Sequence, residues 1–361
     1  MSELSNGANP GSAAGPLLSV RSLSKHFEIR SRGFFSKTVG MVRAVEDVSF
    51  DLQPGETLGL VGESGSGKTT VARCIMRALQ PTSGQILFQT AAGSIVDLAT
   101  LGERSLKALR PQAQMIFQDP FSSLNPRMTV GQIVAEPLVV HGLTRRSEID
   151  GRVVDILSRV GLKPDHRTRY PHAFSGGQRQ RIGIARALIM RPSLVIADEA
   201  TSALDVSVQA QVLNLLKDLQ REFRLTFLFV AHNLDVVRHF CDRVAVMYAG
   251  RVVELGRTSQ IFSNPLHPYT RALMAAVPWP DPDVKMNFDV PGEVADPTRL
   301  PSGCSFHPRC PRCFAPCPTV RPDLRDVDGT GRFAACHLHD PAYAPESGEA
   351  KSVSNSNRAS A

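Results

Sequence analysis

The sequence contains no apolar run long enough to cross a lipid bilayer. Its longest clean run, Leu225–Ala231, has the length of a strand and ends at His232, whereas a membrane-spanning helix needs at least ~18 apolar residues. Residues 1–16 are rich in Ser, Gly, Asn and Ala, carry the acidic Glu3 and have no hydrophobic core of signal-peptide length. These absences predict a cytosolic protein with a disordered N-terminus.

Continuous basic tracts and sustained heptad repeats are also missing. The formal net charge is +7, but the Lys and Arg residues are scattered apart from short pairs such as Arg145-Arg146. Scattered basic charge does not indicate a nucleic-acid partner, because work beside an anionic membrane surface accounts for it equally well. A chain of 361 residues, 42% of them hydrophobic, suffices for a nucleotide-binding domain with an accessory region.

What the sequence does contain is a complete phosphate-binding motif. Residues 62–69 fit G-x-x-x-x-G-K-[ST], between a strand-like run at Leu58–Val61 and helical spacing from Val71 to Leu79. The glycines allow a tight turn in which successive backbone N–H groups point inward and form an anion-binding site. The start of the following helix adds a positive electrostatic potential. The sequence therefore predicts a nucleoside triphosphate site formed by Gly62, Glu63, Ser64, Gly65, Ser66, Gly67, Lys68, Thr69 and Thr70.

Polar residues follow three predicted strands. Gln118 follows Met115–Phe117, Asp198 and Glu199 follow Leu194–Ala197, and His232 follows the run that begins at Leu225. Two adjacent carboxylates at the end of a buried strand are costly unless a cation or a proton is shared there. Mg²⁺, with Thr69 as a further ligand, and a reacting water would meet that need.

Two other stretches also suggest ligand contacts. Ser175, Gly176, Gly177 and Gln178 open a helix expected to run through Ile189 to Pro192, and unpartnered N–H groups at a helix start favour anions. Alternating residues at Leu18–Leu23 and Val48–Leu52 predict half-buried strands, with Arg30–Arg43 as an exposed loop. Phe27, ahead of that loop, could stack on adenine or be an ordinary core residue.

In this order the motifs resemble the ATP-binding cassette (ABC) family from about Leu17 to Leu255, although Phe174 stands where the family commonly has Leu. The resemblance implies an α/β P-loop NTPase: a mostly parallel sheet core, an N-terminal antiparallel β subdomain and a helical subdomain at about 127–174. In the family's pattern the conserved parts are the Walker A loop (62–69), the Q-loop Gln118, the signature Ser175–Gln178, the Walker B strand Leu194–Asp198, the catalytic Glu199, the D-loop Ser202–Asp205 and the switch His232.

The same resemblance implies how such a chain works. Two cassettes pack head to tail, so each ATP lies between the P-loop of one chain and the signature of the other. Mg²⁺ is held by Thr69, Gln118 and Asp198, while Glu199, His232 and Gln118 serve hydrolysis. Asp205, in the D-loop, is expected to bind the nucleotide as well.

Further stretches resemble the ATPase subunits of bacterial oligopeptide and dipeptide importers. These are Gly33–Gly40, Asp119–Pro126, His267–Leu273 and Gly303–Pro311. This resemblance implies peptide import at the cytoplasmic face of the bacterial inner membrane, with a second cassette ATPase, two transmembrane permease subunits and an extracytoplasmic solute-binding protein, and without nucleic acid. Nickel and glutathione importers share these marks, so the solute stays open. The expected domains are a cassette at 17–256, a C-terminal extension with a cysteine cluster at 257–340 and a disordered tail at 341–361.

Two other classes of function compete with this interpretation. Soluble cassette ATPases that act on nucleic acid or the ribosome usually carry tandem cassettes or a long coiled coil, whereas this chain has one cassette. A regulatory nucleotide binder without turnover is expected to lack Glu199 or His232, and both are present.

Five of the seven cysteines lie between Cys304 and Cys336. In a reducing compartment such clustering favours a metal or cluster over disulfides. The ligand types suit Zn²⁺, with short pairs at Cys310-x₂-Cys313 and Cys313-x₃-Cys317, or an iron–sulfur cluster, and unligated thiols are a third possibility. The resemblance favours a structural [4Fe–4S] cluster on Cys304, Cys310, Cys317 and Cys336, with Cys313 as an extra thiol.

Overall fold

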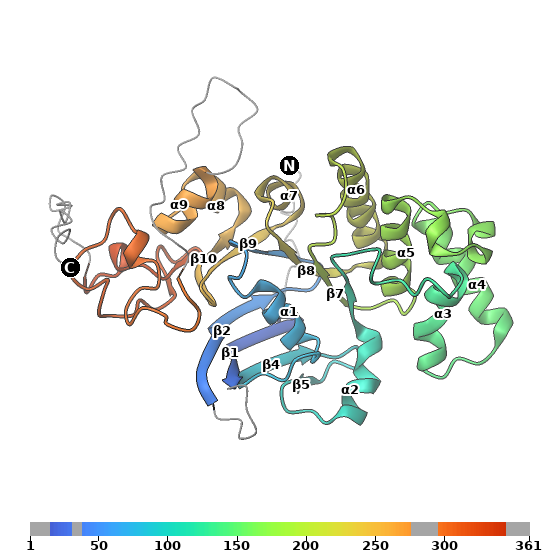
Figure 1. Ribbon diagram of the computed structural model, residues 1–361, viewed down its shortest axis with the longest axis horizontal. Helices are drawn as coiled ribbons and strands as arrows, with labels where there is room; N and C mark the ends of the chain where they lie inside the picture. Colours follow the sequence, from blue (N-terminus) through green and yellow to red (C-terminus); the bar gives the residue numbers. More distant parts are fainter. Residues whose placement is uncertain (1–14, 31–37, 276–294, 344–361) are drawn as a thin grey trace, which may run out of the picture.

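Two β-sheets form the body of the computed structural model (Figure 1), which describes residues 15–30, 38–275 and 295–343. The larger sheet has the strand order β11-β12-β10-β9-β3-β8-β7-β6, and the smaller has the order β2-β1-β4-β5. The strands are β1 Leu18–Arg30, β2 Thr38–Leu52, β3 Thr57–Val61, β4 Ser83–Gln89, β5 Ile95–Asp97, β6 Ala113–Ile116, β7 Leu194–Asp198, β8 Thr226–Ala231, β9 Arg243–Tyr248, β10 Arg251–Arg257, β11 Arg325–Asp326 and β12 Phe333–Ala334.

Helices cover the larger sheet and extend beyond its β6 edge. In the described ranges none of them combines the length and the apolarity needed to cross a membrane. The α-helices are α1 Lys68–Ile75, α2 Glu103–Leu109, α3 Val130–Val140, α4 Arg146–Arg159, α5 Gly176–Leu188, α6 Val206–Phe223, α7 Leu234–Phe240, α8 Thr258–Ser263 and α9 Pro268–Ala275. Short 3₁₀ turns lie at Arg110–Gln112, Pro164–Thr168, Pro171–Ala173, His307–Arg309 and His337–His339.

The central strands β3, β7, β8 and β9 are parallel and almost entirely buried, and the edge strand β6, also parallel, is partly buried. Their side chains alternate between two cores. Leu58 and Leu60 belong to the core shared with the smaller sheet and α1, whereas Phe227 and Phe229 belong to the core under α6 and α7. Because parallel strands end at one edge, this arrangement gathers the residues that follow β3, β6, β7 and β8.

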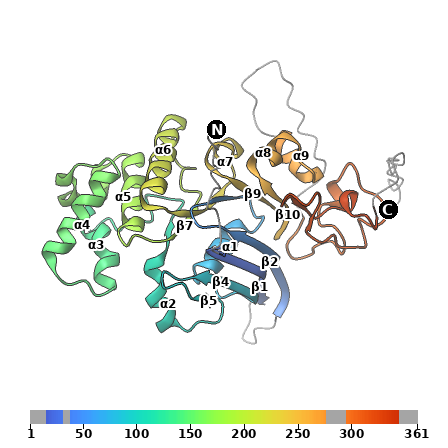
Figure 2. The ribbon, with the colours of Figure 1, turned by 180° about the vertical axis from the view of Figure 1, so that it is seen from behind.

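The elements are spread along the long axis of the molecule. Figures 1 and 2 both show α3 and α4 at one end and residues 295–343, called the C-terminal segment below, at the other. In this segment β12 pairs with β10, so the C-terminal segment continues the larger sheet. The predicted α/β class, with its mostly parallel core, antiparallel β subdomain and helical part, is confirmed; the domain boundaries stay predictions.

Three local predictions differ from the structure. Residues 38–43 of the expected loop Arg30–Arg43 belong to β2, because they pair with β1 in a long antiparallel ribbon. The helix after the P-loop ends at Ile75 rather than near Leu79, since Arg77 has a left-handed backbone (φ 55°) and its Nε donates to the Leu98 carbonyl (2.6 Å). The helix expected to reach Pro192 ends at Leu188.

Some predictions fall outside the described residues. They are the disordered ends, at 1–14 and 344–361, and residues 33–37 of the Gly33–Gly40 stretch.

Candidate functional site

The loop between β3 and α1 needs glycine at two positions. Gly62 has φ +152°, and a Cβ there would lie 2.1 Å from the Met247 carbonyl oxygen. Gly67 has φ +100°, and its Cβ would lie 2.3 Å from the Ala44 carbonyl oxygen. Within the described chain the start of α1 has no side-chain cap, so its first N–H groups have no side-chain acceptor and can bind an anion.

Lys68 lies under this loop, with only 5% of its surface exposed. Its Nζ donates to the carbonyl oxygens of Gly62 (2.8 Å) and Glu63 (2.9 Å). Burial lowers the pKa of Lys68, while the charges of Glu199, Asp198 and Glu63 act in the opposite direction. Lys68 is therefore a desolvated cation in the field of three carboxylates. A bound polyphosphate would contact its ammonium group directly and favour the charged form.

Asp198 ends β7 and is also buried, with 3% of its surface exposed. The Thr69 hydroxyl donates to Asp198 Oδ1 over 3.0 Å. Burial raises the pKa of Asp198, the Thr69 hydrogen bond lowers it, and the neighbouring Glu199 charge raises it again. A buried carboxylate, a hydroxyl and the nearby Gln118 amide are the oxygen donors that Mg²⁺ prefers, so these residues fit that cation.

The Glu199 side chain, after β7, contacts the residues that follow β6 and β8. Its Oε2 accepts a hydrogen bond from Gln118 Nε2 (2.8 Å) and lies 3.4 Å from His232 Nδ1. The backbone of Glu199 is left-handed (φ 47°), and its N–H donates to the Val230 carbonyl (2.9 Å). A non-glycine residue in this conformation stores strain of ~1–3 kcal/mol, which is common where a side chain must be aimed.

Lys68, Thr69, Gln118, Glu199 and His232 lie around one hollow of about 390 Å³, which Asp198 reaches only through its hydrogen bond with Thr69. Its lining joins the P-loop to the strand ends, with one contribution from β2: Ala44, Ser64, Gly65, Gly67, Lys68, Thr69, Thr70, Gln118, Glu199 and His232. Ala44 was not singled out from the sequence, because a small apolar residue on a strand carries no chemical signal. The geometry suits in-line attack of water on a phosphoryl group held by the loop.

Comparison with known proteins identifies the family of this chain. A family model described as "ABC transporter" matches residues 45–202, and one described as "Oligopeptide/dipeptide transporter, C-terminal region" matches residues 253–317. The chain is 52% identical over 330 residues to a probable peptide ABC transporter ATP-binding protein, y4tS, of Sinorhizobium fredii, covering 91% of each chain. It belongs to the ABC transporter ATPases.

Two further similarities support this assignment. The oligopeptide transport ATP-binding protein AppF of Bacillus subtilis is 49% identical over 90% of this chain and 97% of its own length. A dimeric, post-hydrolysis structure of the cassette MJ0796, bound to ADP and Pi, matches with a TM-score of 0.57 and 27% identity, covering 67% of this chain and 98% of that one. The predicted ATPase activity and cassette fold are confirmed.

Not all of the predicted site residues line this hollow. Of the described residues that line the hollow, none belongs to the signature Ser175–Gln178. The signature instead opens α5 with a capping box, in which Ser175 Oγ accepts from Gln178 N (3.4 Å) and Gln178 Oε1 accepts from Ser175 N (3.1 Å). A Cβ on Gly177 would lie 2.5 Å from Val208 Cγ1, so this glycine lets α5 approach α6 closely. Asp205 is exposed at the start of α6.

Phe27 likewise lies outside this lining. It is 36% exposed on β1 and pairs with Val42 of β2, while the Lys25 ammonium lies 4.9 Å from its ring centroid. A core role is therefore excluded by exposure, and the contact with adenine stays a prediction.

The cysteine cluster requires a correction. Within the described ranges, which include all seven cysteines, no group of three or more His, Cys, Asp or Glu side chains is placed to hold a metal ion. The [4Fe–4S] prediction for Cys304, Cys310, Cys317 and Cys336 is therefore wrong, and the Zn²⁺ alternative has no site either.

The physical reason is that these thiols are packed as small apolar side chains. Burial, with a smaller contribution from the neighbouring thiols, raises the pKa of Cys304, Cys310 and Cys336 to about 12 each, which disfavours the thiolate that metal ligation requires. Cys304 and Cys310 pack against the larger core, and Cys317 is 7% exposed. In place of a metal, hydrogen bonds such as that from Cys304 N to the Cys317 carbonyl (2.8 Å) hold the segment together.

Proposed function

We propose that this ATPase is the nucleotide-hydrolysing subunit of a bacterial peptide importer. The observation that carries the proposal is the joint presence of the P-loop hollow, with Glu199 facing it, and the C-terminal region of the oligopeptide/dipeptide group. The relatives named as peptide or oligopeptide transport ATP-binding proteins cover nearly the whole chain, which favours peptide over nickel or glutathione as the solute.

The residues at the hollow have different proposed roles in ATP hydrolysis. The P-loop N–H groups and Lys68 bind the phosphates, and Thr69, Asp198 and Gln118 would hold Mg²⁺. Bound there, the cation would neutralise the charge that develops on the phosphates. Glu199 would orient the attacking water and accept its proton, while His232, 3.4 Å from the Glu199 carboxylate, would contact the γ-phosphate.

A second cassette would complete the site. Since Ser175–Gln178 lie outside the lining of the hollow, the signature is available to the nucleotide of a partner cassette arranged head to tail, either a copy or a related chain. The dimeric MJ0796 cassette, bound to ADP and Pi, supports this arrangement. ATP would then close the pair, and hydrolysis would reopen it.

The exposed stretch around Gln118, residues 117–126, is the proposed contact with membrane permease subunits. Phe117 and Phe121 are 47% and 56% exposed, and the Arg179 guanidinium lies 4.2 Å from the Phe121 ring centroid. Because Arg179 belongs to α5, this contact connects the loop to the signature helix. The chain would thus lie on the cytoplasmic face of the inner membrane, below two permeases and, across the membrane, a solute-binding protein.

The test is transport by the complex that co-purifies with this chain. Reconstituted into vesicles, it should accumulate labelled di- or oligopeptides when ATP and Mg²⁺ are supplied. Lys68→Ala should lower the affinity for MgATP at least ~10-fold, since a buried charge pair with phosphate is lost, and abolish uptake. Uptake of nickel or glutathione without uptake of peptide would contradict the proposed solute.

Phe121→Asp tests the coupling loop. A carboxylate cannot be buried in an apolar groove of a permease without a large desolvation cost, so ATP-driven uptake should fall at least ~10-fold. Binding of nucleotide to the isolated chain should stay within twofold of wild type. Ile95→Asp, at a 67% exposed position on β5, is the matched control and should transport normally. Undiminished uptake by Phe121→Asp would refute the coupling role.

A further inference from the structure

Glu63, the second residue of the P-loop, is held from three sides. Its carbonyl oxygen accepts from Lys68 Nζ (2.9 Å), and its N–H donates to the Tyr269 hydroxyl over 2.9 Å. Its carboxylate pairs with the Arg309 guanidinium, Nη1 to Oε2, over 3.1 Å. Tyr269 belongs to α9 and Arg309 to the C-terminal segment, so two of the three contacts come from outside the P-loop region.

The two partners of Glu63 are themselves buried. Tyr269 is 1% exposed and Arg309 is 8% exposed. The ring of Phe306, three residues before Arg309, packs against Tyr248 (5.3 Å between centroids) and Tyr269 (5.4 Å). Since Tyr248 ends β9 next to the P-loop, these aromatic rings fix the distance between the C-terminal segment and the loop.

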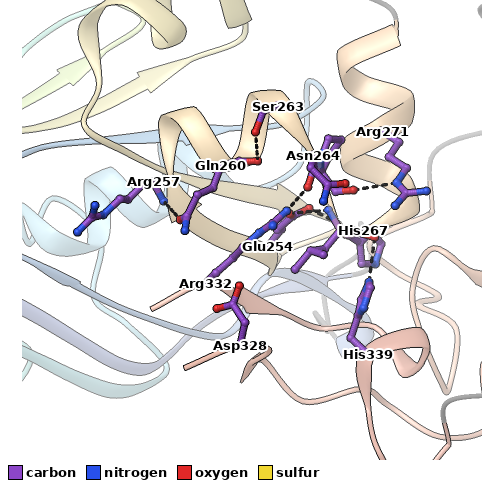
Figure 3. Close-up of polar contacts among 12 residues, drawn as sticks. Glu254, Arg257, Gln260, Ser263, Asn264, His267, Arg271, Asp328, Arg332 and His339 are labelled. Carbon is purple, nitrogen blue, oxygen red and sulfur yellow. Dashed lines mark hydrogen bonds and ion pairs between the residues drawn. The ribbon is translucent and has the colours of Figure 1, made fainter. Parts of the chain in front are cut away.

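A buried carboxylate anchors this arrangement to the sheet. Glu254 of β10, with 0% exposure, accepts from the backbone N–H of Leu266 (2.8 Å) and of His267 (2.9 Å), just before α9. Figure 3 shows Arg332 and His339 of the C-terminal segment reaching the same turn. Arg332 lies 3.6 Å from the Glu254 carboxylate and donates to the Asn264 carbonyl, and His339 Nε2 lies 3.2 Å from the Leu266 carbonyl.

The charge of Glu63 matters because of where it lies. Its carboxylate is one of the three whose field acts on Lys68, the proposed phosphate-binding cation. An unpaired carboxylate there would repel a polyphosphate, and Arg309 offsets that charge with a guanidinium whose side chain is 9% exposed.

We propose that Arg309 and Tyr269 are positioning residues of the ATP site, through which the docked C-terminal segment sets the affinity of the P-loop for nucleotide. Tyr269 fixes the Glu63 peptide, and Arg309 neutralises its side chain and turns it away from the phosphates. The inference rests on the proposed binding of ATP at the P-loop. It predicts that this cassette loses affinity for ATP when the segment separates from the loop.

The test compares Arg309→Gln with its Glu63→Gln double variant in the full-length chain, with the Kd for MgATP measured at low and high salt. Arg309→Gln leaves the Glu63 charge unpaired and should raise the Kd ~3–10-fold, with the larger effect at low salt. Adding Glu63→Gln removes that charge and should restore the Kd to within twofold of wild type. In the assembled transporter Arg309→Gln should raise KM for ATP more than it lowers kcat.

Three further variants complete the design. Arg325→Gln removes the same charge from the same segment, at a residue paired with Asp340 (2.9 Å), and should keep the wild-type Kd. Tyr269→Phe removes only the hydroxyl and should raise the Kd ~2–5-fold, because the Glu63 N–H loses its acceptor. Loss of binding in Lys68→Ala reports separately on the proposed nucleotide site.

The outcomes are distinct. Rescue of Arg309→Gln by Glu63→Gln, together with a larger loss of affinity at low salt than at high salt, supports the proposal, because both results identify the Glu63 charge as what weakens the binding of MgATP. A double variant that binds as weakly as Arg309→Gln, or an Arg309→Gln variant with the wild-type Kd at both salt concentrations, would overturn it. A wild-type chain that binds ATP as weakly as Lys68→Ala would instead refute the nucleotide site itself.

Discussion

Replacing Glu199 by Gln should lower kcat for ATP hydrolysis by ~10²–10⁴-fold, the usual effect of losing a positioned base. The amide keeps the size of the side chain and its contact with Gln118, but it cannot accept a proton from water. The variant should still bind ATP and should accumulate as a closed, ATP-bound pair of cassettes. Phosphate release by the assembled transporter and nucleotide binding by the isolated chain measure the two effects.

Gln is the informative substitution because the backbone at position 199 is left-handed (φ 47°). A β-branched side chain there would add strain and confuse a folding defect with a catalytic one. Glu148→Gln makes the same chemical change in an exposed i,i+4 pair with Arg152 and should leave kcat as it is. Steady-state ATPase activity of Glu199→Gln close to that of wild type would refute the role of this carboxylate.

The site could be predicted from the sequence where its parts are local. The Walker A residues lie within one short stretch, and the two glycines are required by carbonyl oxygens that would collide with any Cβ. Gln118, Glu199 and His232 could be placed together because each follows an apolar strand, and parallel strands end at one edge. Their mutual contacts agree with that argument.

Contacts between distant residues could not be predicted in the same way. Glu63 was recognised as part of a phosphate loop, but its partner Arg309 lies 246 residues further along the chain. Nothing in the stretch around Arg309 indicates which surface it faces, since a solvated Arg has the same sequence signature. Likewise, Arg30–Arg43 is basic enough to suggest a loop, and only its pairing with β1 makes residues 38–43 a strand.

The cysteines show a second limit of prediction from the sequence. Their spacing and the surrounding prolines suggested a ligand set, but spacing does not reveal whether the thiols are arranged to hold a metal ion. In the described residues they form no metal-holding group, and burial raises the pKa of Cys304 and Cys310 to about 12 each, which favours the thiol form. What holds the C-terminal segment is instead pairing with β10 and the buried Glu254.

Replacing Glu254 by Ala should therefore lower the free energy of unfolding by about 3–5 kcal/mol, the usual cost of breaking a buried pair from one side. The change leaves the Arg332 guanidinium, whose side chain is 9% exposed, without its carboxylate. It also removes the acceptor from two backbone N–H groups before α9, one of them in the 1% exposed His267. Urea unfolding of the full-length chain measures the loss.

The matched control is Glu103→Ala. The Glu103 side chain is 71% exposed in its pair with Arg110, so its removal should cost no more than about 1 kcal/mol. Equal stability of the two variants, with unchanged amide exchange in α9 and β12, would contradict the anchoring role of Glu254.

If the C-terminal segment separates locally instead, amide hydrogen exchange in α9 and β12 should rise before the core unfolds. Because α9 carries Tyr269, such a variant should also bind ATP more weakly, which would connect the stability of this turn to the P-loop.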